Sequence, residues 1–148
     1  MPSEERNTIV GLITSLIVNA YFFWRISQMF ADGTSEAPDG LQIWAQTVLW
    51  VVPVSIVATI VLTILASILH GIFTGETKGI FVKDERDRQF ELWCMGATMA
   101  MAVVGFLGSM TLLALGYSPF IAFNLIYLSF ALGDVAGNVL KLAMYRCL

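Results

Sequence analysis

The sequence predicts an all-α integral membrane protein that crosses the bilayer with four helices arranged in two hairpins. Apolar residues make up 57% of the 148-residue chain and charged residues only 13%. Soluble domains are typically about 45–50% apolar and about 25% charged. The apolar residues gather in a few long blocks, as in chains solvated by lipid. None of these blocks alternates apolar and polar residues as a barrel strand would, so each block is expected to be a helix.

Four blocks are long enough to cross the hydrocarbon core, which takes about 20 mostly apolar residues. Together they predict a single transmembrane domain over residues 1–148. Pro53 lies inside the second block, where it removes a backbone donor and should bend the helix. The predicted spans are residues 8–30, 41–69, 90–115 and 120–142.

The breaks between the blocks indicate how the spans connect. Residues 31–40 are rich in Gly, Asp, Ser and Pro, a composition typical of a loop. Gly116 suits the C-terminal cap of the third helix, and Pro119 suits the first turn of the fourth. A tight turn is therefore predicted between the third and fourth spans.

Seven of the eight Lys and Arg residues fall on one side of this layout, at the two termini and in the loop between the second and third spans. Arg25 is the exception, and its long side chain can reach the opposite interface. Since cytoplasmic loops carry an excess of Lys and Arg, both termini and the central loop are expected in the cytoplasm.

The most informative polar pattern lies in the fourth span. Six polar residues follow heptad spacing and should form one stripe, which should not face lipid. Asp134 is the most unusual of them, because it is an acidic residue well inside a span. The residues of this polar seam are Asn124, Tyr127, Asp134, Asn138, Lys141 and Tyr145.

Two interpretations of the seam remain open. It could lock the fourth helix to its neighbours through hydrogen bonds, with Asp134 paired or protonated, and such contacts commonly serve packing. Alternatively, Asp134 could be a proton or cation site with Lys141 as a neighbouring charge. Pairs of small residues, Gly133 with Gly137 and Gly105 with Ser109, allow close approach of helices. Gly96 and Ala100 form another such pair.

The central loop carries mixed charges that support an exposed helical turn or a docking surface for a partner. This loop motif consists of Lys83, Asp84, Glu85, Arg86, Asp87 and Arg88. Together with Gly96, it resembles the central motif of a family of small bacterial four-helix membrane proteins. Residues 124–128 and the ending around Lys141 and Arg146 resemble the fourth-helix pattern of that family. The resemblance implies a bacterial inner-membrane location and carries no catalytic residue.

Several functional classes have no support in the sequence. There is no nucleophile–base pair or phosphate-binding loop, and one histidine with two separated cysteines offers no metal site. We therefore expect no enzymatic activity, no catalytic or metal-binding residues and no cofactor. The net charge of −3 gives no indication of nucleic-acid binding.

The leading hypothesis is an accessory or regulatory membrane protein, surrounded by lipid, that associates with itself or with a larger membrane complex. The alternative is a small oligomeric proton or cation transporter or channel that uses the polar face of the fourth helix. A single chain of this size can hardly enclose a wide path, so transport would require at least a dimer.

The predicted orientation can be tested by labelling single cysteines from outside the cell, in a variant without Cys94 and Cys147. Cysteines placed at Ser35 and Ser118 should react with a membrane-impermeant maleimide, whereas cysteines at Ser3 and Thr77 should react only after permeabilisation. The opposite pattern would invert the topology.

Overall fold

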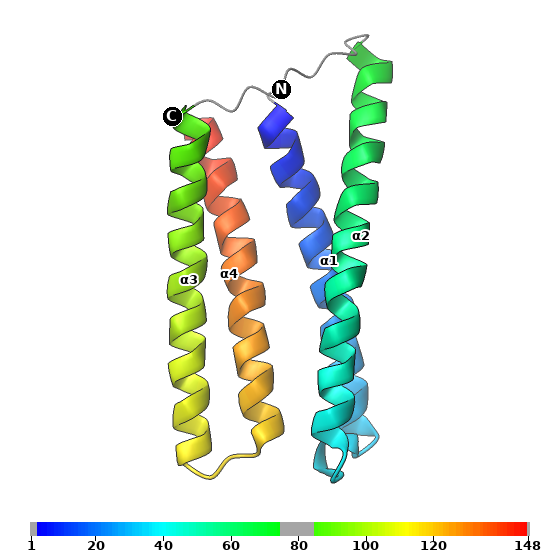
Figure 1. Ribbon diagram of the computed structural model, residues 1–148, viewed down its shortest axis with the longest axis vertical. Coiled ribbons are helices and arrows are strands. Elements are labelled where there is room, and N and C mark those ends of the chain that lie inside the picture. The colour runs from blue at the N-terminus through cyan, green and yellow to red at the C-terminus, as the bar shows by residue number, and fades with distance from the viewer. Residues whose placement is uncertain (1–2, 75–84, 148) are drawn as a thin grey trace.

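The computed structural model describes residues 3–74 and 85–147, and these residues form four long α-helices (Figure 1). The described residues contain no strand. Each long helix is long and apolar enough to cross a membrane, which confirms the predicted all-α fold with four transmembrane helices. The elements are α1 (Ser3–Ala31), the short 3-10 helix η1 (Thr34–Glu36), α2 (Gly40–Thr74), α3 (Glu85–Ala114) and α4 (Pro119–Cys147).

The helices form two hairpins whose connections lie at one end of the bundle. We call this end, at the bottom of Figure 1, the turn end. The opposite end is the termini end, where α1 and α3 begin and α2 and α4 finish, with α2 reaching beyond the other three helices.

Helix boundaries agree with the predicted spans at the turn end and differ at the termini end. At the turn end, each boundary lies within one residue of the prediction, as with Gly40 against residue 41. At the termini end, each helix continues five residues further, as with Ser3 against residue 8 and Thr74 against residue 69. Hydropathy marks only the hydrocarbon core, whereas the backbone hydrogen bonds of a helix can continue into the polar interface.

Gly116 ends α3 as predicted. Its φ of 85° is in the left-handed region, where glycine carries no steric penalty. The Gly116 N–H donates to the Leu113 carbonyl and the Tyr117 N–H donates to the Leu112 carbonyl, both at 3.0 Å. This pair of bonds is the Schellman arrangement of a helix C-terminus. Pro119 then opens α4.

The α3–α4 hairpin is closely packed through small residues. A methyl group at Gly105 would overlap the Ser129 side chain, and one at Gly137 would lie 2.9 Å from Thr98 Oγ1. Thr98 Oγ1 also donates a hydrogen bond across the interface to the Gly133 carbonyl, at 3.0 Å. These contacts confirm that the Gly133–Gly137 pair allows close helix approach.

The pair formed by Gly96 and Ala100 behaves differently. Both residues are exposed, and a methyl group at Gly96 would find no atom within 4 Å. Gly96 therefore makes no close helix contact within the described part of the chain.

The other hairpin, formed by α1 and α2, packs most tightly toward the turn end. Its core is an apolar cluster in which Phe22 is fully buried and Phe120 of α4 is 3% exposed. Figure 1 shows α4 and α1 as the two central helices, flanked by α3 and α2. Of the four candidate spans, that of α2 is the least buried. The cluster consists of Phe22, Ile26, Met29, Trp44, Val51 and Phe120.

Gly105 and Gly96 form a matched pair for testing the α3–α4 contact, because both lie inside α3. Gly105→Ala should lower the free energy of unfolding by about 1–3 kcal/mol, the usual cost of overpacking. Gly96→Ala should be neutral or stabilise by up to about 1 kcal/mol, since alanine is the better helix former. Unfolding in mixed micelles with increasing SDS, followed by circular dichroism, measures both changes. Equal effects of the two substitutions would contradict the close contact.

Candidate functional site: a polar cavity at membrane depth

The polar seam of α4 faces two different neighbours. Asn124, Tyr127, Asp134 and Asn138 hydrogen-bond among α1, α2 and α4 themselves. The last two members of the seam turn to α3. Lys141 Nζ lies 3.7 Å from Glu91 Oε1, and the Tyr145 ring packs edge-to-face on Phe90, with the ring centroids 5.4 Å apart.

Helix geometry contributes to this division. A straight α-helix drifts by about 20° per heptad relative to a strict seven-residue repeat. Over the three heptads from Asn124 to Tyr145 the stripe therefore rotates by about 60°. Lys141, expected beside Asp134 in the transport hypothesis, instead forms its ion pair with α3 and does not line the cavity described below.

Toward the turn end, the seam contributes to a closed aromatic cluster. Trp44 Nε1–H donates to Asn124 Oδ1 at 3.1 Å. The Tyr127 ring stacks on Phe22 with a centroid separation of 3.7 Å, and Phe22 meets Trp44 edge-to-face at 6.4 Å. The space between α1, α2 and α4 is therefore filled on this side.

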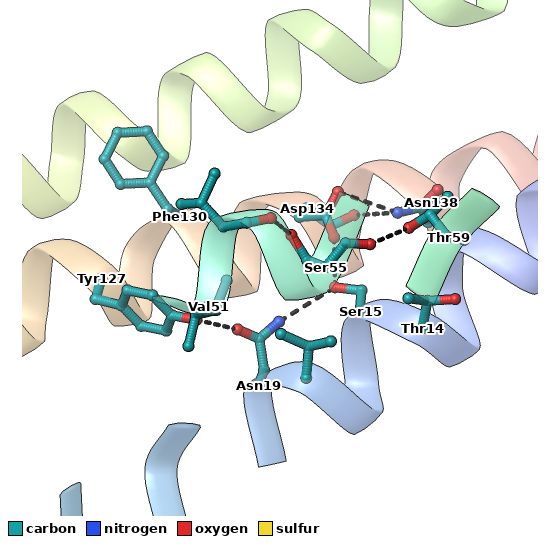
Figure 2. Close-up of a pocket in the computed structure, with 14 residues that line it drawn as sticks. Thr14, Ser15, Asn19, Val51, Ser55, Thr59, Tyr127, Phe130, Asp134 and Asn138 are labelled. Atoms are coloured by element: carbon teal, nitrogen blue, oxygen red, sulfur yellow. Dashed lines mark hydrogen bonds between the residues drawn. The ribbon is translucent and has the colours of Figure 1, made fainter. Parts of the chain in front are cut away.

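A directed chain of hydrogen bonds runs from this cluster to Asp134 (Figure 2). The Tyr127 hydroxyl donates to Asn19 Oδ1 at 3.0 Å, and Asn19 Nδ2 donates to Ser15 Oγ at 3.1 Å. The Ser15 hydroxyl in turn donates to Asp134 Oδ2. Asn138 Nδ2 donates to Asp134 Oδ1 at 3.2 Å. The carboxylate is the terminal acceptor of the chain, which joins α1 to α4.

Asp134 and its partners line a cavity of about 490 Å³ between α1, α2 and α4. This volume falls in the range of about 300–1,000 Å³ that is typical of small-molecule sites. Asp134 is exposed into this space and is the single charged residue of the lining. The polar lining residues are Thr14, Ser15, Asn19, Ser55, Thr59, Tyr127, Asp134 and Asn138.

Polar contacts join the helices beyond the cavity lining toward the termini end. Arg6 Nη2 donates to Ser67 Oγ at 3.3 Å and thereby links α1 to α2. Arg146 Nε lies 3.6 Å from Glu5 Oε1 and links α4 to α1. The aromatic cluster therefore bounds the cavity toward the turn end, and these two contacts hold α1 to α2 and to α4 on its other side.

The side of the cavity is open. Val52 of α2 and Phe130 of α4 both line it, and they are 52% and 53% exposed. Figure 2 shows Phe130 projecting away from α1, toward the side where α3 runs. The opening lies between α2 and α4.

Sequence reasoning found the α4 part of this site and missed the parts on α1 and α2. Ser15 with Asn19 on α1, and Ser55 with Thr59 on α2, are polar pairs four residues apart inside apolar spans. Residues four apart share a helix face. This four-residue spacing was the sequence feature that could have identified the polar faces of α1 and α2.

The described part of the central loop motif, from Glu85 on, begins α3 at the termini end, away from the cavity lining. Lys83 and Asp84 lie outside the described residues. Glu85 and Arg88 are exposed in the first turns of α3, at the position expected for an interfacial helix start.

No protein-family model matches the chain, and no curated protein or solved structure matches it significantly. The resemblance carried by the loop motif thus stays a prediction. Any functional conclusion must come from the cavity itself.

The hydrogen bond from Tyr127 to Asn19 can be tested with a pair of tyrosine variants. Tyr127→Phe removes one contact between α4 and α1 and should lower the free energy of unfolding by about 0.6 kcal/mol, the mean for interhelical polar contacts in membranes. Tyr117→Phe is the control, because Tyr117 is exposed in the α3–α4 turn and should show no change. SDS unfolding of both variants gives the comparison; a Tyr127→Phe variant as stable as the control would contradict the bond.

Proposed function

We propose that this protein is a non-enzymatic membrane transporter that accepts a proton or another cation at Asp134 and carries it across the bilayer as an oligomer. The cavity around Asp134 is the observation that carries the proposal. A seam used only for packing would place its polar side chains against a neighbouring helix. Here the acidic member is exposed into a space of about 490 Å³.

The chemistry of the lining supports a site for positive charge. A charged side chain at the centre of a membrane span costs about 2.5–3.5 kcal/mol on insertion scales. No lysine or arginine lines the cavity, so no basic residue of the lining offsets this cost for Asp134. A bound proton or cation would neutralise it. Intramembrane carboxyl groups of this kind commonly mark ion and proton pathways.

Helix α2 is the element best suited to open the cavity. Pro53 lies between two lining residues, Val52 and Ser55, and proline leaves the helix without one backbone donor at that point. Bending at Pro53 would move the α2 wall of the cavity while α1 and α4 stay joined by Ser15 and Asp134. Access could then alternate between the two ends.

A second candidate is the accessory subunit, and the α3 surface favours it. Beside Gly96 lies an apolar hollow of about 460 Å³ formed by Leu92, Trp93, Gly96, Ala97 and Leu140. Small residues facing open space allow another helix to approach closely. The same surface could join two copies of the chain, which a transporter of this size needs.

We further propose a bacterial inner-membrane location with the termini end in the cytoplasm. The asymmetry of Lys and Arg supports this orientation. The resemblance of the loop motif to small bacterial membrane proteins supports the location.

Asp134 provides the test between the two candidates. In vesicles with reconstituted protein and a pH-sensitive dye inside, wild type should pass protons or alkali cations faster than lipid alone. Asp134→Asn should fold with unchanged helicity and lose this flux. Asp32→Asn should keep this flux, because Asp32 is exposed in the turn between α1 and η1 and does not line the cavity.

Two results, obtained together, would turn the conclusion toward the accessory role. One is wild-type vesicles with no flux above lipid alone. The other is dissociation of the oligomer by Asp134→Leu, which leaves Asn138 without its carboxylate partner. Size-exclusion chromatography with light scattering measures the latter.

A further inference from the structure

We propose that the ligand of the cavity is a monovalent organic cation with an apolar body, and that it enters sideways from the bilayer. This inference rests on the proposed function and names its substrate class. It draws on the charge of the lining, its apolar and aromatic side chains and the position of its opening.

The charge of the lining favours a ligand with a single positive charge. Asp134 is the one charged residue among the lining side chains, and neither lysine nor arginine lines the cavity. One carboxylate balances one positive charge. A ligand of higher charge would leave an uncompensated charge at membrane depth, which is costly.

The oxygen atoms of the lining do not form a cage for a bare metal ion. A dehydrated Ca²⁺ takes six to eight oxygen ligands, and Mg²⁺ demands near-ideal octahedral geometry. The lining supplies one carboxylate, and the described residues hold no group of three or more His, Cys, Asp or Glu side chains that could bind a metal ion. A cavity of this size with one carboxylate suits a larger cation.

Apolar and aromatic side chains supply the rest of the wall. Val18, Val51, Val52 and Phe130 line the cavity beside the Tyr127 ring. Apolar walls with a few placed polar groups are the usual composition of small-molecule sites. Aromatic faces also attract organic cations. The lining thus matches a molecule that carries an ammonium-type charge on a hydrophobic body.

The opening faces the hydrocarbon. Val52 lies twelve residues after the start of α2, or about 18 Å along it, and Phe130 lies eleven residues after the start of α4, or about 17 Å along it. In a hydrocarbon core of about 30 Å these half-exposed residues sit near the middle. The aromatic cluster fills the space toward the turn end, and the half-exposed Val52 and Phe130 leave a lateral route for a lipid-soluble ligand.

Tetraphenylphosphonium and tetraphenylborate provide a matched pair of probes, since they share shape and apolar surface and differ in the sign of charge. Equilibrium dialysis against purified protein in detergent should show saturable binding of tetraphenylphosphonium and none of tetraphenylborate. Asp134→Asn should weaken the cation's binding at least tenfold. Asp32→Asn should leave it unchanged, and Phe130→Ala should weaken it without removing it.

The outcomes separate this inference from the proposed function. Binding of both probes alike, or cation binding unaffected by Asp134→Asn, would overturn the inference. Proton or alkali-cation flux that needs Asp134, without tetraphenylphosphonium binding, would overturn it and leave transport standing. Binding that depends on Asp134, in vesicles without any flux, would support the ligand class and overturn transport.

Discussion

The position of a carboxylate at membrane depth is the constraint on which the arrangement of α1 and α4 depends. Lipid offers no hydrogen bonds, so protein, water or a ligand must satisfy the oxygens of Asp134. Ser15 donates to one oxygen and Asn138 to the other. Because Ser15 is held by Asn19, and Asn19 by Tyr127, this requirement fixes the relative height of α1 and α4.

The two hairpins solve the problem of packing in lipid differently. Between α3 and α4, glycines bring the backbones close enough for Thr98 to donate to a carbonyl of the other helix. Between α1 and α2, bulky aromatic residues fill the turn end, and the region beyond them stays open as the cavity. The α3–α4 hairpin is therefore closely packed, while the α1–α2 hairpin forms two walls of the cavity.

Much of the fold follows from the sequence because lipid imposes length and polarity on each span. Hydropathy located the turn-end boundaries to within one residue. The helices themselves continue five residues past these spans at the termini end, where charged residues such as Glu5 and Arg146 lie. For the site, heptad spacing identified the polar face of α4. It could not show which neighbour each residue of that face meets: Tyr127 bonds to Asn19 of α1, whereas Lys141 pairs with Glu91 of α3. The partners on α1 and α2 depend on tertiary packing that spacing alone does not encode.

The contact between Gly105 and Ser129 has a consequence for how this chain can evolve. The two positions share one volume, because a methyl group on the first overlaps the side chain of the second. A larger residue at position 105 becomes acceptable only when position 129 shrinks to glycine. A larger residue at position 105 is poorly tolerated alone, so related sequences should change positions 105 and 129 together. Such paired exchange would record the helix contact in sequences long after overall similarity has faded.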